Sequence, residues 1–283
     1  MEFVQYLLTA GEVQMPNSSG VVTKVWQRHT TSQRLIRQFI WLAVIAAIVA
    51  SLRSVQVIPE FLLDAPEQVR DMLQRMWPIA WGTYAKTVHE ALIETIHIAS
   101  LGTLLAVVMA LPFGFLVARN VTPSPLLNTF ARIVLVSSRS VNSLVWALLF
   151  VAIFGPGALA GTLAIAFRSI GFVGKLIGEA LEEVPPGPIE ALKAAGATKS
   201  SQMNYGFWPA IRPAFWAIVL LRWDINVRES SVLGLVGAGG IGMALNAAIE
   251  TFRWDIVALI LFAVFVIVIA AEIVVSSVRK RLL

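Results

Sequence analysis

The first candidate for chemistry is a run of glycines, Gly237, Gly239, Gly240 and Gly242, in which three spell the pattern GxGxxG. In nucleotide-binding proteins that pattern holds a pyrophosphate, but only when it follows a strand and opens a helix inside a βαβ unit. Here the run lies between two long apolar segments. Because glycine permits unusual backbone angles and close backbone approach, we expect a re-entrant bend or a tight helix contact instead of a nucleotide site.

The sequence offers no other pattern for nucleotide, metal or thiol chemistry. The glycines before Lys175 fail the GxxxxGK[ST] spacing of a P-loop, and the chain has no cysteine. Three histidines, His29, His89 and His97, lack the spacing of a metal site. We therefore expect no enzyme activity, cofactor or metal in this chain. If ATP hydrolysis drives it, a separate polypeptide must bind the ATP and Mg²⁺.

Charged side chains in or beside long apolar segments are a further candidate site. They are Arg139, Arg168, Arg222, Asp224, Arg228 and Glu229. A charge at the bilayer centre costs about 2.5 to 3.5 kcal/mol on insertion scales, so such groups face a bundle interior or an aqueous cavity. Asp224 and Arg228 are four residues apart and can pair on one helical face. For Arg139 and Arg222, structural pairing and a pore-lining role both stay open.

The composition of the chain indicates the class of protein to which these residues belong. The 283 residues are 57% apolar and 14% charged, with a mean hydropathy of +0.76, whereas soluble domains carry about 25% charged residues. The chain is therefore expected to be an integral membrane protein. Its net charge of +5 is modest and its basic residues gather in a few segments, which indicates a topology signal and no nucleic-acid surface.

Six apolar segments are long enough to cross a bilayer, which takes about 20 helical residues. They cover about residues 39–58, 93–118, 133–154, 158–177, 207–227 and 256–278. Basic residues flank the first segment before Phe39 and close the last one at Arg279, Lys280 and Arg281. By the positive-inside rule, both termini and the loop between the fourth and fifth segments then lie in the cytoplasm.

The expected organisation follows from those segments. Residues 1–38 form a polar cytoplasmic segment with a turn at 16–20 and no cleavable signal peptide. Residues 59–90, which carry interfacial aromatic residues, form an amphipathic segment that lies on the periplasmic face of the membrane. Residues 91–283 form the remaining membrane domain.

The loop over residues 185–209 is a polar interruption that predicts two short helices. Pro188 suits the first turn of a helix over 189–195, and Gly196 stands where a C-terminal glycine belongs. Small residues give this first helix low relief, which suits insertion into a groove of another protein. They are Ala191, Ala194, Ala195 and Ala197.

The second helix of this loop is expected over residues 199–205. Thr198 or Ser200 can cap its N-terminus. Gly206 and Pro209 are expected to end it.

This loop resembles the coupling loop of ABC-importer permeases, since Glu190, Ala191, Gly196 and Pro209 have its order and spacing. The family pattern is Glu-Ala-Ala, three residues, Gly, nine residues, Ile, one residue, Leu, Pro. The chain departs from it at Leu192, Gly206 and Trp208. The alternative is an ordinary Ala-rich hairpin in a cytoplasmic loop.

Other stretches resemble the phosphonate-uptake branch of this family, which includes phosphite carriers. They lie at residues 139–148, 169–180 and 222–242, and the resemblance covers the chain from about Glu94 to its end. The branch often has a proline where this chain has Asn142. The resemblance implies an all-α polytopic membrane protein of about six transmembrane helices with the type I ABC-importer permease fold.

The resemblance also implies partners and sites. Expected partners are a second copy of the chain, two cytoplasmic ATP-binding subunits, a periplasmic substrate-binding protein and lipid of the bacterial inner membrane. Coupling to the ATPase would involve Glu190, Ala191, Ala194, Ala195, Gly196 and Pro209. The translocation pathway would involve Arg139, Asn142, Arg222, Asp224, Arg228, Gly237, Gly239, Gly240 and Gly242.

Two other functions remain as alternatives. The same machine could carry another cargo such as methionine. An ion-driven secondary transporter could instead bind protons or ions at Asp224, Glu229 or Glu272. A membrane enzyme is disfavoured, because the sequence shows no nucleophile–base or metal constellation.

Overall fold

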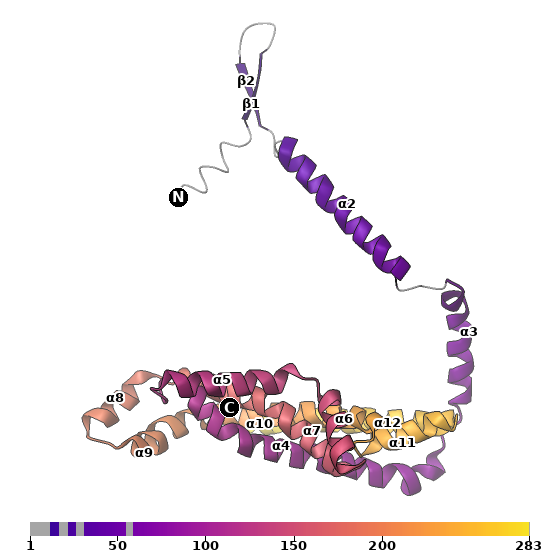
Figure 1. The fold of residues 1–283 in the computed structure, drawn as a ribbon. Coiled ribbons are helices and arrows are strands. Elements are labelled where there is room, and N and C mark those ends of the chain that lie inside the picture. The colour runs from indigo at the N-terminus through magenta and orange to yellow at the C-terminus, as the bar shows by residue number, and fades with distance from the viewer. Residues whose placement is uncertain (1–11, 17–21, 27–30, 55–58, 283) are drawn as a thin grey trace. The chain divides into compact units, whose positions relative to one another are not determined.

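The computed structural model describes residues 12–16, 22–26, 31–54 and 59–282 (Figure 1). The chain divides into two compact units, Met1–Val69 and Arg70–Leu283.

The first unit contains a two-stranded hairpin and a long helix. Strands β1 (Glu12–Pro16) and β2 (Val22–Trp26) pair antiparallel with Glu12 opposite Trp26. This hairpin is an addition to the expected all-α membrane fold, in a segment where valine, threonine and tryptophan favour extended backbone. The turn expected at 16–20 lies, after Pro16, outside the described residues.

The first membrane segment is the helix α2 (Thr31–Ser54), whose span-like part is Leu35–Ser54. The helix begins earlier than the predicted start at Phe39, because the preceding polar residues continue it without a glycine or proline. The predicted end at Ile58 falls outside the described residues.

The segment over 59–90 does not form one amphipathic element. Helix α3 (Pro59–Arg75) follows that expectation, but the turns η1 (Trp81–Thr83) and η2 (Tyr84–Val88) run directly into α4 (His89–Val117). No glycine or proline follows Gly82 before the apolar span, so helical backbone propagates backwards. Val88 is fully buried in an apolar cluster with residues of the last helix, which fixes this extension in place.

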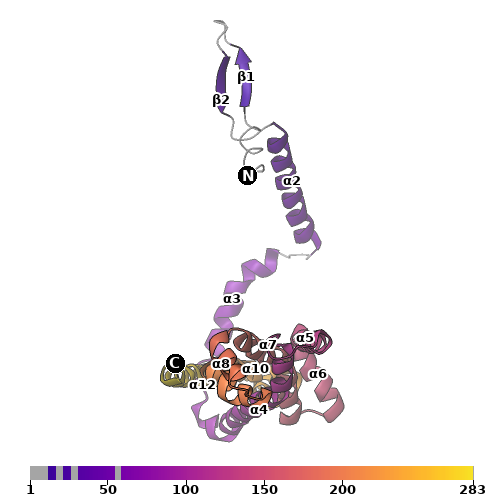
Figure 2. The same cartoon turned by 90° about the vertical axis from the view of Figure 1, so that its left-hand side faces the viewer.

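The second unit is a bundle of long helices around α4 and α7. Besides α4, this bundle contains α5 (Pro125–Ser140), α6 (Ser143–Phe154), α7 (Ala158–Glu182), α10 (Trp208–Leu233), α11 (Ile241–Glu250) and α12 (Trp254–Leu282). Small residues let α4 and α7 approach closely: a Cβ on Gly102 would lie 2.7 Å from Ile165, and one on Gly114 would lie 3.0 Å from Ile177. Figure 2 views the bundle from one end and shows α12 and α5 on opposite sides of it.

Within the described residues, four helices are long and apolar enough to cross a membrane, and up to six spans result if each of two bent pairs counts as one. The continuous third span predicted over 133–154 is wrong, because α5 and α6 meet at an angle of 88°. The first helix ends at Ser140, and Asn142 starts the second, since its side chain accepts the Leu144 N–H at 3.1 Å. An N-cap thus makes the bend without proline.

The connections identify the two ends of this bundle. At one end the loop after α4 joins the end of α7, where the Arg119 N–H donates to Glu182 Oε1 at 2.9 Å. At the other end the α6–α7 turn meets the glycine run, where the Gly157 N–H donates to the Gly237 carbonyl at 2.9 Å. The 185–209 loop leaves from the first of these ends, which we call the hairpin end.

Candidate functional site

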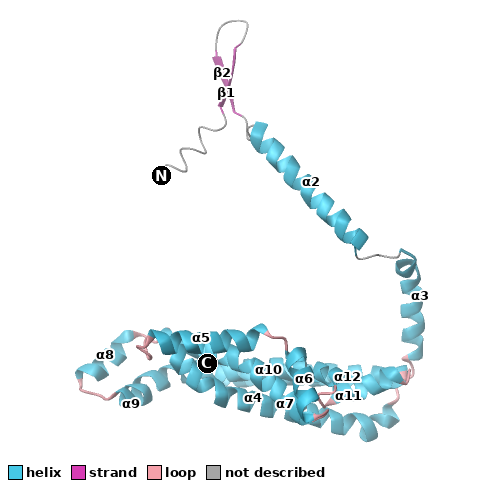
Figure 3. Cartoon of the chain, in the orientation of Figure 1, coloured by secondary structure: helices cyan, strands magenta, loops and turns pink. Residues whose placement is uncertain are grey.

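The 185–209 loop forms a helical hairpin that projects beyond the ends of the neighbouring helices (Figure 1). Its first helix is α8 (Pro186–Ala194) and its second begins as α9 (Lys199–Gln202), with a short loop between them (Figure 3). Gly196 has φ +78°. The Gly196 N–H donates to the Lys193 carbonyl at 3.0 Å and the Ala197 N–H to the Leu192 carbonyl at 2.9 Å, so the predicted glycine C-cap is confirmed as a Schellman motif.

The second helix begins as predicted but does not end as predicted. Thr198 caps it by accepting the Ser201 N–H at 3.3 Å. Beyond Gln202 the chain passes through a π turn, η3 (Met203–Phe207), into α10. Pro209 stands in the first turn of α10, where its missing N–H does no harm. The hairpin is therefore joined to α10 by continuous helical backbone.

The hairpin exposes its small residues and packs against the bundle through Ile189. Ile189 is buried in a cluster that includes Phe207 and Ile211. The predicted coupling residues Glu190, Ala191, Ala194, Ala195, Gly196 and Pro209 are all exposed. This exposure fits a docking surface for another protein, although the role of each residue stays a prediction.

Gly206 is a closely packed residue of the hairpin that the sequence did not identify as a packing site. It is buried, and a Cβ there would lie 2.5 Å from Ile189 Cδ1 and 3.0 Å from Leu192 Cδ1. The family pattern has Ala and Ile where this chain has Leu192 and Gly206. A larger residue on α8 is thus matched by a smaller one on η3, so the two departures compensate each other.

This complementarity predicts a coupled pair of substitutions. We expect Gly206→Ile to destabilise the hairpin by about 1 to 3 kcal/mol through overpacking. Adding Leu192→Ala makes room for the new side chain and is expected to recover at least about 1 kcal/mol of that loss. The measurement is the protection of α8 against hydrogen exchange in the two single variants and the double variant. Additive losses would contradict the proposed compensation.

Buried polar side chains join three helices in the bundle interior. Arg222 on α10, 2% exposed, donates from Nε to Ser169 Oγ of α7 at 2.8 Å. Ser169 Oγ donates to Asn226 Oδ1 at 3.2 Å, and Asn226 Nδ2 donates to Thr103 Oγ1 of α4 at 2.7 Å. We call these four residues the polar network. It fixes the register of α4, α7 and α10, because each buried polar atom would otherwise lose its partner.

Glu229 links this network to a second arginine. Its Oε1 accepts from Arg168 Nη1 at 2.6 Å and its Oε2 from Arg222 Nη2 at 3.4 Å. Arg222 also lies 5.3 Å from the centre of the Phe172 ring. Of the two roles left open for Arg222, the geometry favours pairing within the bundle, since it is almost wholly buried.

The remaining predicted pathway charges lie apart from that network. Asp224 and Arg228 form the expected ion pair along one face of α10, with Arg228 half exposed and Asp224 Oδ1 without a partner among the described residues. Arg139 and Asn142 lie exposed at the α5–α6 bend. The structure therefore does not gather all predicted pathway residues into one site.

The glycine run is the tight bend that its composition predicts. Gly237, Gly239 and Gly240 have φ between +72° and +85°, where L side chains are strained. A Cβ on Gly239 would lie 2.7 Å from Ala158 of α7, and one on Gly242 would lie 2.5 Å from the Ser231 carbonyl. The Ile241 N–H donates to Thr95 Oγ1 of α4 at 2.8 Å. The run thus locks the end opposite the hairpin.

Comparison with known proteins identifies a matching family and several similar proteins. The family described as binding-protein-dependent transport system inner membrane component matches residues 110–283. The phosphite transport system permease protein PtxC of Stutzerimonas stutzeri is 40% identical over 190 residues, which cover 67% of this chain and 69% of that protein. The phosphate-import permease protein PhnE of Mycolicibacterium smegmatis is 36% identical over 237 residues, covering 84% of this chain. The chain spans 44% of that PhnE.

A solved structure shares the arrangement of helices. A chain from an inward-facing conformation of the MetNI methionine ABC transporter matches with a TM-score of 0.61, over 70% of this chain and 96% of that chain. The two sequences are 20% identical, so this likeness concerns the fold. The expected helical fold is thereby confirmed, with the β1–β2 hairpin as an addition.

Proposed function

Because the chain belongs to the family of binding-protein-dependent transport system inner membrane components, we propose that it is the permease subunit of an ATP-driven importer of phosphonate or phosphite. The family consists of membrane subunits, so ATP and Mg²⁺ would be bound by a separate ATPase. The proposed direction of transport is from periplasm to cytoplasm.

The observation that carries this proposal is the projecting α8–α9 hairpin. It leaves the bundle at one end, exposes its small residues and is anchored through Ile189. Because η3 continues it into α10, a push on the hairpin would reach Arg222 along one helix. Rigid-body rocking of helices is an established way to alternate access.

The proposed assembly contains two permeases. The described chain offers one coupling hairpin, whereas an ATPase dimer presents two docking sites, so we propose a homodimer with two cytoplasmic ATPase subunits and one periplasmic binding protein. ATP would close the ATPase dimer and move residues 189–205. The loaded binding protein would then release its ligand into the pathway, and hydrolysis would reset it. In this orientation the hairpin end and both termini lie in the cytoplasm.

The cargo is proposed from relatives and charge. The similar proteins PtxC and PhnE are named for phosphite and phosphate transport. Arg139 lies beside the spans and has no carboxylate within 4 Å among the described residues, and positive charge lowers the barrier for an anion. Methionine is the alternative, since the MetNI transporter has the same fold.

The test is ligand-dependent ATPase activity of the assembled complex in liposomes. We expect stimulation, several-fold, by binding protein loaded with a phosphonate or phosphite and none by binding protein exposed to methionine. If only methionine stimulated the ATPase activity, the cargo would be methionine and not a phosphorus oxyanion. Solute uptake driven by an ion gradient, with no ATPase bound to the hairpin, would refute the transporter class.

A further inference from the structure

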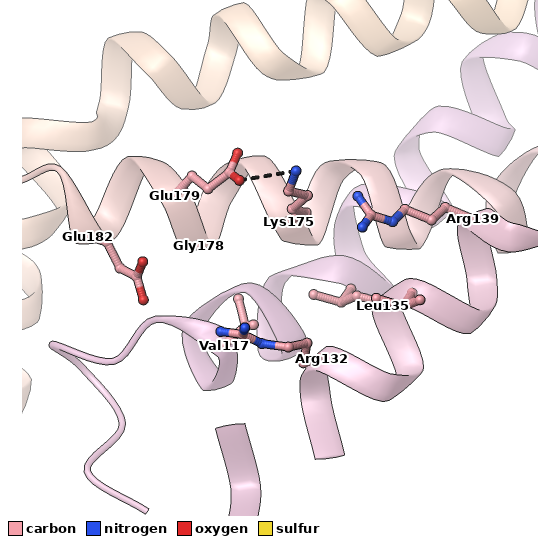
Figure 4. A pocket seen from close by; sticks show the side chains of 9 residues that line it. Val117, Arg132, Leu135, Arg139, Lys175, Gly178, Glu179 and Glu182 are labelled. Atoms are coloured by element: carbon pink, nitrogen blue, oxygen red, sulfur yellow. Dashed lines mark ion pairs between the residues drawn. The ribbon is translucent and has the colours of Figure 1, made fainter. Parts of the chain in front are cut away.

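A cleft between α4, α5 and α7 carries positive charge along the half of α7 that leads to the hairpin end. Its volume is about 210 Å³, large beside the roughly 30 Å³ that a water molecule occupies in the liquid. Its charged lining consists of Arg132 and Arg139 from α5 and of Lys175, Glu179 and Glu182 from α7. Figure 4 shows the Arg139 side chain extending along the cleft toward Lys175.

The acidic side chains of the cleft are already engaged. Glu179 Oε1 lies 3.2 Å from Lys175 Nζ, and Glu182 Oε1 accepts the Arg119 N–H. Among the residues that the structure describes, no carboxylate lies within 4 Å of the guanidinium of Arg132 or Arg139. Two arginines therefore remain available to an anion that enters the cleft.

The packing of α5 on α7 fixes these arginines at different depths. A Cβ on Gly171, near the middle of α7, would lie 3.1 Å from Arg139 Cβ. Arg132 lies two helical turns nearer the hairpin end, on the same face of α5. Since α7 has 25 residues and is about 37 Å long at 1.5 Å per residue, Arg139 lies level with the middle of this apolar helix. An exposed guanidinium at that depth must face water or protein.

We propose that this cleft binds a phosphorus oxyanion in transit, with Arg139 as the deeper and Arg132 as the shallower contact. A guanidinium presents two parallel N–H donors to phosphate-type oxygens, which suits this cargo better than an ammonium. Glu179 and Glu182 lie toward the hairpin end, where their charge favours release of the anion. The net negative headgroup of an anionic phospholipid such as phosphatidylglycerol offers the same oxygens and charge, but the depth of Arg139 favours the free anion. This inference rests on the proposed function.

The experiment measures phosphite uptake by the complete complex in liposomes of neutral phosphatidylcholine and in liposomes that also contain phosphatidylglycerol. We expect Arg132→Gln with Arg139→Gln to lower the maximal uptake rate at least tenfold in both lipids. Arg139→Lys, which keeps the charge, should retain more uptake than Arg139→Gln. The matched control is Arg212→Gln, an exposed arginine on α10 outside the cleft.

Each outcome separates this inference from the proposed function. Wild-type uptake by the double variant would overturn the proposed anion site in the cleft, but not the proposed importer function. A defect confined to liposomes with phosphatidylglycerol would identify a lipid-headgroup site and overturn the transit site. A wild-type complex that takes up no phosphite, phosphate or phosphonate would overturn the proposed cargo, and the inference with it.

Discussion

Gly196→Val is expected to reduce ATP-driven uptake more than tenfold while the chain still inserts and assembles. Gly196 has φ +78°, and a Cβ there would meet no atom within 4 Å. The substitution therefore acts through the backbone alone, at a cost of about 1 to 2 kcal/mol for an L residue in the left-handed region. Loss of the Schellman motif would tilt α8 away from its position relative to α9. The measurement is uptake by the complex in liposomes, together with ATP hydrolysis.

The chain supplies a matched control for that variant. Gly187 lies in α8, the helix that ends just before Gly196; it is exposed and would also accept a Cβ without contact, but its φ is not positive. Gly187→Val should therefore keep most of the uptake. Full uptake by Gly196→Val would show that coupling to ATP hydrolysis does not depend on the shape of the hairpin. Failure of Gly196→Val to reach the membrane would instead make this turn a requirement for folding.

Glu229→Gln is expected to destabilise the bundle by about 3 kcal/mol, because it leaves a buried arginine without its carboxylate. Glu229 contacts both Arg168 and Arg222, and the Arg222 side chain is 3% exposed. The measurement is the midpoint of thermal unfolding in detergent, followed by tryptophan fluorescence. We expect a fall of several degrees.

Two further variants test the physical reason for that loss. Asp71→Asn breaks the exposed Arg75–Asp71 pair, which measures 2.9 Å, and should cost less than about 1 kcal/mol. Arg222→Met combined with Glu229→Leu removes the buried Arg222–Glu229 pair and leaves only Arg168, whose side chain is 30% exposed, without its carboxylate, so it should recover part of the stability. If Glu229→Gln unfolds no earlier than Asp71→Asn, the carboxylate does not stabilise Arg222.

Several features followed from local patterns in the chain. The apolar segments predicted a polytopic helical membrane protein, and the cap residues predicted the glycine turn at Gly196 and the cap at Thr198, both of which the structure has. The four-residue spacing predicted the Asp224–Arg228 pair. These signals were sufficient because each depends on residues within one or two helical turns.

Tertiary structure decided the features that join distant helices. Thr103 and Asn226 are 123 positions apart, so only the packing of α4 against α10 brings them together in the polar network. The compensation between Leu192 and Gly206 and the cleft at Arg139 likewise depend on how helices approach each other. Sequence periodicity determines which residues share a helix face, whereas the register between helices is fixed by close contact of glycines and side chains, which no single segment encodes.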